Sequence, residues 1–250
     1  MKNIKYLIQL LVLGLIILAT SCKKDSENIS KTTYYPDFKM AGAQENFLPL
    51  GTAFTDSGVT ATENGVQITV TKNIAGDYFS FTGSQVDISS PNKYIITYSA
   101  TNKDGFPGSV ERDVYIVSTG DLVTNIEGLY TCDSVVRNDE KKFFGLNYIM
   151  IRKVSGNTYE LSDAIGGYYD LGRLYGAAYR ATGATVTAVN IATNNFTYGP
   201  SFGVGAFGGV ANIVSFAVDA ATKTITFETD WDGGPYTFAV TLTQVNILSL

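Results

Sequence analysis

Histidine is absent from the 250-residue sequence, which contains only two cysteines and one tryptophan. Without histidine the chain cannot perform Ser-His-Asp or Cys-His catalysis, and it lacks a common zinc ligand. Glycoside hydrolysis stays chemically open because it needs only two carboxylates at a suitable separation. Asp230 and Asp232 could form such a pair, since residues i and i+2 of a strand share a face about 7 Å apart. The favoured interpretation is a turn, where aspartate is common, and no enzymatic activity is predicted.

The one long apolar run, residues 7–19, follows a short basic region that contains Lys2 and Lys5. As a helix this run would span about 20 Å, which is shorter than the ~30 Å hydrocarbon core of a bilayer. Its length and position favour a signal peptide, residues 1–21, over an uncleaved anchor helix. Removal of this peptide changes the net charge from −5 to −7, because it takes two lysines away. An acidic chain without a basic stripe is not expected to bind nucleic acid.

The predicted signal peptide is followed by a cysteine in the sequence Leu18-Ala19-Thr20-Ser21-Cys22, which resembles a bacterial lipobox. The resemblance implies that Cys22 becomes the lipidated first residue of the mature chain, anchored in the outer membrane at the cell surface. More than one acyl chain gives stable anchoring, at about 0.8 kcal/mol per buried CH2. The polar residues 22–32 would then be a flexible tether. The charges just after Cys22 resemble surface-export signals of Bacteroidetes lipoproteins, and a solvated linker fits them equally well.

Acylation of Cys22 leaves Cys132 without a second thiol, so no disulfide is expected in the mature chain. The apolar-polar alternation around Cys132 predicts a small buried side chain. No metal or cofactor is predicted either. Residues 203–208 match G-x-G-x-x-G, but the β-branched residues that follow do not predict the helix that a dinucleotide site requires. Asp230 and Asp232 match only a fragment of a calcium loop.

Residues 33–118 show short alternating stretches separated by turn signals, which is typical of a β-sandwich. Residues 65–71 alternate as one strand, and residues 93–100 as another. The second strand is predicted to bury Tyr94, Ile96, Tyr98 and Ala100 on one face. A turn over residues 102–105 and a final strand over residues 109–117 complete the pattern.

Residues 91–117 resemble the end of the immunoglobulin-like modules that are common in bacterial surface proteins. The pattern is a Tyr-x-x-x-Tyr strand, a turn with Asp-Gly, and an Arg-x-Val-x-Val strand. The residues that match it are Tyr94, Tyr98, Asp104, Gly105, Arg112, Val114 and Ile116. The resemblance implies a spacer or interaction module for residues 33–118, without an active site.

Residues 118–121 interrupt the pattern, and residues 121–250 are predicted to form a second antiparallel β-domain, with a meander or barrel-like arrangement. Beyond a first strand near residues 126–130, the predicted strands are 147–153, 158–162, 185–191, 211–218, 224–229 and 236–245. Residues 126–130 and 166–176 resemble the C-terminal β-domain of Bacteroidetes surface lipoproteins encoded with outer-membrane glycan importers. The chain is therefore expected to be all-β, and an importer complex is a partner that the resemblance implies.

Residues 163–183, here called the tyrosine-rich segment, contain four tyrosines and five glycines. Its internal glycines disfavour a helix and predict extended chain with glycine bends. Tyrosine and tryptophan rings stack on sugar faces, while charged groups bind hydroxyls. The residues predicted to bind glycan are Trp231, Tyr168, Tyr169, Tyr175, Tyr236, Arg173 and Asp232. The alternative for each ring is packing in the core, which is the commoner role of tyrosine in a small β-domain.

The expected function is that of a lipid-anchored surface protein that binds polysaccharide for nutrient uptake without cleaving it. Two alternatives stay open. One is a structural or protein-interaction lipoprotein of an outer-membrane complex, and the other is a carboxylate glycosidase.

Overall fold

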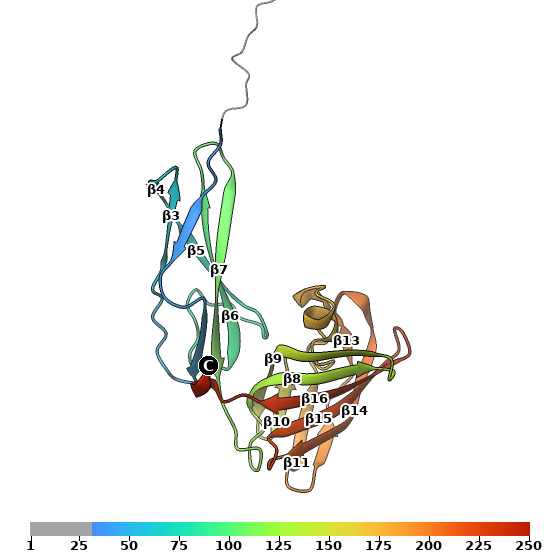
Figure 1. Ribbon diagram of the computed structural model, residues 1–250. Helices are drawn as coiled ribbons and strands as arrows, with labels where there is room; N and C mark the ends of the chain where they lie inside the picture. The colour runs from blue at the N-terminus through green and yellow to red at the C-terminus, as the bar shows by residue number, and fades with distance from the viewer. Residues whose placement is uncertain (1–31) are drawn as a thin grey trace, which may run out of the picture.

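The computed structural model describes residues 32–250, so the predicted signal peptide, Cys22 and nearly all of the predicted tether lie outside the described residues. The prediction of an all-β chain is confirmed, because the regular structure consists of strands and a few helical turns of three to five residues (Figure 1). Within residues 32–250, none of the helical elements has the length and apolar character needed to traverse a bilayer.

The N-terminal part of the structure, β1 to β7, is an immunoglobulin-like pair of small sheets. The three-stranded sheet has the order β1 (Asp37–Met40), β3 (Val59–Glu63), β4 (Val66–Ile68). The four-stranded sheet has the order β2 (Glu45–Pro49), β7 (Pro107–Val117), β6 (Asn92–Thr101), β5 (Thr71–Gly76). Only β2 and β7 pair in parallel, and the other pairs are antiparallel.

The predicted inward face of β6 is confirmed, since Tyr94, Ile96, Tyr98 and Ala100 are all buried between the sheets. The prediction of one strand over residues 65–71 is wrong. This stretch divides into β4, which pairs with β3, and β5, which pairs with β6. Alternation reports which face a side chain occupies, but it carries no information about which sheet supplies the hydrogen-bonding partner.

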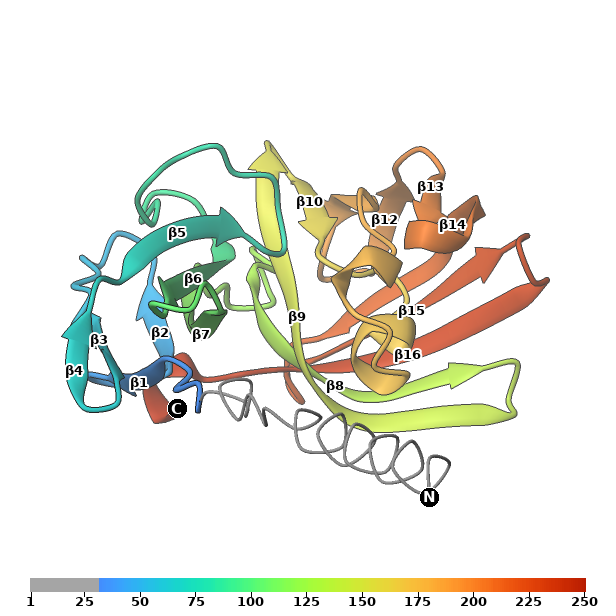
Figure 2. The ribbon, with the colours of Figure 1, turned by 90° about the horizontal axis from the view of Figure 1, so that it is seen from above.

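The C-terminal part, β8 to β16, is one antiparallel sheet of nine strands that curls into a half-barrel (Figure 2). Its order is β12 (Asn195–Tyr198), β11 (Thr185–Asn190), β10 (Thr158–Leu161), β9 (Lys141–Ser155), β8 (Gly128–Arg137), β16 (Tyr236–Gln244), β15 (Thr224–Trp231), β14 (Gly208–Asp219), β13 (Phe202–Val204). The curl brings β12 toward β14, where the Phe196 and Phe216 rings lie 4.9 Å apart. All six predicted strands are present, including the β14–β15–β16 meander.

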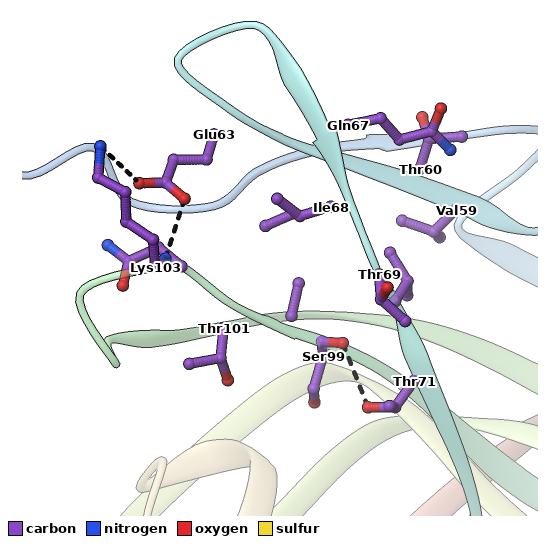
Figure 3. A pocket seen from close by; sticks show the side chains of 13 residues that line it. Val59, Thr60, Glu63, Gln67, Ile68, Thr69, Thr71, Ser99, Thr101 and Lys103 are labelled. Carbon is purple, nitrogen blue, oxygen red and sulfur yellow. Dashed lines mark hydrogen bonds and ion pairs between the residues drawn. The ribbon is translucent and has the colours of Figure 1, made fainter.

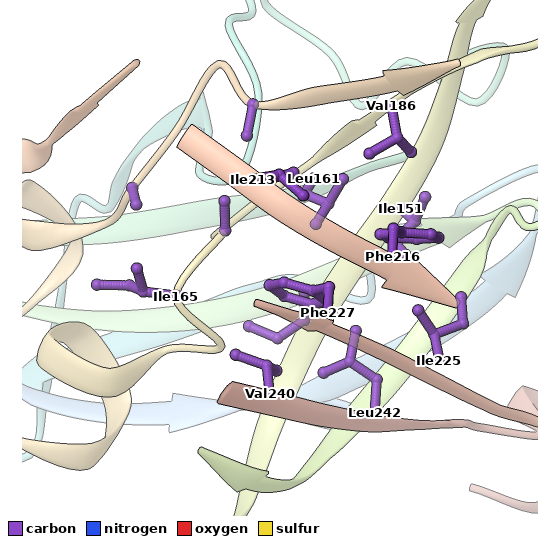
Figure 4. Packing of buried hydrophobic residues seen from close by; sticks show 14 of the residues in the cluster. Ile151, Leu161, Ile165, Val186, Ile213, Phe216, Ile225, Phe227, Val240 and Leu242 are labelled. Atoms are coloured by element: carbon purple, nitrogen blue, oxygen red, sulfur yellow. The ribbon is translucent and has the colours of Figure 1, made fainter. Parts of the chain in front are cut away.

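The half-barrel closes around an apolar core that its concave face supplies. Ile151, Phe227 and Leu242 point inward from three different strands, and Ile165 of the tyrosine-rich segment packs among them (Figure 4). Full burial of each such side chain contributes about 1.5–3 kcal/mol. Cys132 belongs to the same cluster and is free and fully buried, as predicted.

A second apolar cluster joins the N-terminal and C-terminal parts. Tyr78 and Tyr115 pack against Leu129 and Met150 of the half-barrel, and the Tyr78 hydroxyl donates a 2.9 Å hydrogen bond to the carbonyl of Tyr148. The last helical turn, η5 (Ile247–Ser249), also contacts β2, so the C-terminus lies against the N-terminal part (Figure 1). This packing gives the two parts a shared interior and not merely a linker.

Candidate ligand-binding surface

The tyrosine-rich segment crosses the open end of the half-barrel as two short helical turns. Gly166 and Gly167 have positive φ values of 62° and 75°, which turn the chain into a π-helical turn, η2 (Tyr168–Gly172). A 3-10 turn, η3 (Ala177–Tyr179), follows. The prediction of extended chain is therefore wrong. Four of the five glycines of the segment have a positive φ, and tertiary contacts stabilise turns that an isolated peptide would not keep.

Asp163 anchors the start of this segment to its end. Its Oδ1 accepts hydrogen bonds from the backbone N–H groups of Ile165 at 3.0 Å and Ala181 at 3.3 Å. Its Oδ2 is buried without a hydrogen-bond partner among the described residues. Complete burial raises the pKa of Asp163 to about 7, because the charged form loses its hydration.

Arg180 anchors the segment to the N-terminal part. Its guanidinium donates to Asp77 Oδ1 at 2.7 Å and to Asp170 Oδ2 at 2.5 Å. Lys93 adds a second cation 3.1 Å from Asp77. Burial alone raises the pKa of Asp77, but hydrogen bonds from Arg180 and the charges of both cations outweigh it and hold that pKa below its usual value. Buried ion pairs thus connect Arg180 to Asp170 within the segment and to Asp77 of the N-terminal part.

Six aromatic side chains meet at this end of the half-barrel and form what we call the aromatic cluster. Its members are Tyr169, Tyr175, Tyr179, Phe207, Trp231 and Tyr236. Tyr169 and Tyr175 are nearly parallel, with centroids 6.1 Å apart, and Phe207 lies 4.8 Å from both Tyr169 and Tyr179. Tyr175 and Phe207 are 45% and 46% exposed, so the cluster presents two open rings on a buried aromatic base.

The structure places the predicted binding residues at different depths. Tyr175 and Arg173 are exposed, and the Arg173 guanidinium lies 3.3 Å from the Tyr175 hydroxyl. Tyr236 is half-buried, while Tyr169 belongs to the base of the cluster. Asp232 is exposed, but its Oδ1 accepts a 2.6 Å hydrogen bond from the Val210 N–H, so this carboxylate fastens a turn.

Two of the predicted residues cannot offer an open face. Tyr168 is completely buried, with its ring against Phe143 and Phe238, and it drops out of the binding set. Trp231, which the sequence predicts to stack on sugar, is only 6% exposed, and its indole N–H donates to the Gly208 carbonyl at 2.9 Å. The reason is strand alternation, which points residue 231 inward together with Phe227 and Thr229.

The sequence alone did not predict three further residues of this surface: Tyr179, Phe207 and Arg137. Phe207 lies in a three-residue helical turn, η4 (Gly205–Phe207), inside the G-x-G-x-x-G match, and β14 begins at the next residue. A phenylalanine within a glycine-rich loop is a sequence signal that could have predicted the exposure of Phe207. Arg137 stacks over the Tyr236 ring at 4.1 Å from its centroid, and no local pattern indicates that contact.

Two shallow hollows adjoin the aromatic cluster. One, of about 390 Å³, is lined by Asn212, Asp230, Trp231 and Tyr236 among others. The second, of about 430 Å³, lies beside Asp170 and Leu174. Asp230 accepts a 2.8 Å hydrogen bond from the Thr237 hydroxyl, so this carboxylate links the neighbouring strands β15 and β16. Within residues 32–250, no three Asp, Glu, Cys or His side chains gather in a metal-binding arrangement.

The N-terminal part has a larger groove of about 1040 Å³, between the β3–β4 hairpin and the end of β6 (Figure 3). Its lining is rich in hydroxyl groups, such as those of Thr60, Thr69 and Thr101. Glu63 lies in it largely buried, and its Oε2 accepts a 2.9 Å hydrogen bond from the Lys103 N–H. The groove has no aromatic side chain, which distinguishes it from the aromatic cluster.

Comparison with known proteins assigns both parts of the chain. A family model described as "-like, C-terminal domain" matches residues 119–244, which is half of the 250-residue chain, and the chain belongs to this family. The model of the bacterial surface protein Ig-like domain matches residues 38–117. The chain is thus an all-β protein with a bacterial-surface Ig-like domain followed by this C-terminal domain.

A solved structure has the same fold. It is the crystal structure of the lipoprotein BT2262 from Bacteroides thetaiotaomicron, with a TM-score of 0.63 and 24% sequence identity. The match covers 84% of this chain and 100% of that one. No curated protein sequence matches the chain.

Proposed function

We propose that this chain is a lipid-anchored bacterial surface protein that binds polysaccharide without cleaving it. The observation that carries the proposal is the pair of open rings, Tyr175 and Phe207, on the buried base of the aromatic cluster. A sugar ring stacks its C–H face on an aromatic ring, and rings held by packing lose little entropy on binding. Arg173 stands beside Tyr175 to bond hydroxyl or charged groups. Asp230 and Asp232 are engaged in turn and strand contacts, which favours binding over hydrolysis.

The anchoring proposal rests on the lipobox-like sequence that ends in Cys22 and on the lipoprotein described for the similar fold. Residues 1–21 would be removed, residues 22–32 would form the tether, residues 33–118 the spacer, and residues 121–250 the binding domain. Labelling cells with a palmitate analogue tests the anchor. The chain should be labelled and recovered with the outer membrane, and a Cys22→Ser variant should be neither.

The binding proposal is tested by titrating the full-length chain with a panel of plant and host polysaccharides, following the emission of Trp231 at the base of the cluster. Tyr175→Ala and Phe207→Ala should each weaken binding about tenfold, because one lost stacking contact is worth roughly 1.4 kcal/mol. Tyr198→Ala is the matched control, since this ring is 40% exposed on β12 and lies outside the cluster. Binding by no polysaccharide, or equal losses in all three variants, would refute the proposal.

A second candidate is a protein-interaction lipoprotein of an outer-membrane importer complex. The observation that favours it is the groove of the N-terminal part, where β4 is an edge strand with an open side. An extended segment of a partner could add to such an edge. A cross-link to a membrane protein that is lost in Thr69→Arg, and retained in Tyr175→Ala, would select this function.

A further inference from the structure

The arginines of this chain divide into two groups. The sequence has five, and three of them form ion pairs: Arg112 with Asp56, Arg152 with Glu160, and Arg180 with Asp77 and Asp170. The other two, Arg137 and Arg173, pair with no carboxylate of residues 32–250. Both lie at the aromatic cluster.

The two unpaired guanidinium groups flank the stacked rings of Tyr169 and Tyr175. Arg137 donates to the Tyr169 hydroxyl at 3.3 Å and lies over Tyr236. Arg173 donates to the Tyr175 hydroxyl at 3.3 Å. The two tyrosine rings are nearly parallel with centroids 6.1 Å apart, so the two guanidinium groups bind the hydroxyls of neighbouring rings. Aromatic contacts orient them, while most of their N–H donors stay available.

Among residues 32–250, no carboxylate near this surface forms an ion pair with Arg137 or Arg173. Asp170 pairs with Arg180. Asp230 and Asp232 keep their negative charges, because their hydrogen-bond partners are neutral, but neither lies within ion-pair distance of the two arginines. Asp139 and Glu140 are exposed in the turn after Arg137, and neither lies within ion-pair distance of it. Two arginines without an ion-pair partner therefore lie beside open rings, in a chain of net charge −5. A guanidinium binds carboxylate or sulfate through two parallel hydrogen bonds, a geometry that neutral hydroxyls do not match.

We infer that the aromatic cluster recognises an anionic polysaccharide, with the sugar ring stacked on Tyr175 and Phe207 and its carboxylate or sulfate group held by Arg173 and Arg137. The inference rests on the proposed function, since it names the class of polysaccharide that the same surface binds. Arg173 is the outer contact because it is exposed, and Arg137, which is partly buried, lies on the other side of the two rings.

The test uses the full-length chain and two matched ligand pairs. Polygalacturonate is compared with its methyl ester to test carboxylate, and carrageenan with its desulfated form to test sulfate. In at least one pair, the anionic form should bind more than tenfold tighter than its neutral counterpart. The pair that shows this difference tells whether the recognised group is a carboxylate or a sulfate. Arg173→Gln and Arg137→Gln should each weaken anionic binding at least tenfold. Lys39→Gln, which removes one exposed charge from β1, should leave it within twofold.

Each outcome decides the inference. Equal binding of anionic and neutral forms, with losses in Tyr175→Ala, overturns the anionic preference and leaves polysaccharide binding intact. The inference is also overturned if Lys39→Gln weakens anionic binding as much as Arg173→Gln does. Non-specific electrostatic attraction to the whole chain would then explain the preference. If no ligand of either pair binds, and none of the neutral panel does, both proposals fail. Arg173 is exposed, so its variant is informative even if Arg137→Gln folds poorly.

Discussion

Arg180→Met is expected to lower the free energy of unfolding by about 3–5 kcal/mol, the range for removing one partner of a buried ion pair. The Arg180 side chain is 8% exposed, and those of Asp77 and Asp170 are 6% and 9% exposed. Methionine preserves most of the apolar stem and removes every charged hydrogen bond. Asp77 keeps Lys93 at 3.1 Å, so Asp170 accounts for most of the loss.

The measurement is urea denaturation of the full-length chain, followed by the fluorescence of Trp231, which reports on the half-barrel. Arg173→Met is the matched control, since it is the same substitution in the same segment at an exposed position without an ion pair. It should change stability by no more than about 0.5 kcal/mol. Adding Asp170→Asn to Arg180→Met should recover at least about 1 kcal/mol, because the uncompensated charge is removed.

A loss of less than about 1 kcal/mol in Arg180→Met, as for an exposed ion pair, would contradict this expectation. No recovery of stability on adding Asp170→Asn would contradict it as well. Either result would mean that water reaches the ion pairs of Arg180 in solution, or that the aromatic packing around Tyr78 alone holds the N-terminal part against the half-barrel.

Three further predictions concern the tyrosine-rich segment and its surroundings. The pKa of Asp163 is raised to about 7, so the folded chain holds a proton that the unfolded chain releases near pH 4. Stability should therefore fall by up to about 4 kcal/mol between pH 4 and pH 7, and urea midpoints of Asp163→Asn should lack this slope. Gly166→Ala should cost about 2–4 kcal/mol, because its φ is +62° and the new Cβ would lie 2.8 Å from Val240. Gly183→Ala, at φ +84° with open space around it, should cost only the backbone strain of about 1–2 kcal/mol, and thermal melts that rank the two equally would contradict the steric argument. The pKa of the Cys132 thiol is raised to about 12 by burial, so a Cys22→Ser chain should react with a thiol reagent only after denaturation.

Local patterns in the sequence determined much of the fold. The buried face of β6 follows from two-residue alternation, and the turn between β14 and β15 follows from Asp219 and the polar residues after it. These features depend on contacts within a few residues, which is the range over which alternation and turn chemistry act. The same patterns identified residues 163–183 as unusual and included Arg173 and Tyr175 among the predicted glycan contacts, with core packing left open as the alternative for each ring.

Tertiary structure alone decided what those residues do. Strand alternation places Trp231 on the same face of β15 as Phe227, and only the curled sheet makes that face the interior. Tyr168 likewise becomes core while Tyr175 stays open. Arg137 reaches the cluster from β8, and Arg180 meets Asp77 across 103 positions of sequence. The physical reason is that burial and ion pairing depend on which distant strands pack together, and only the folded half-barrel determines that.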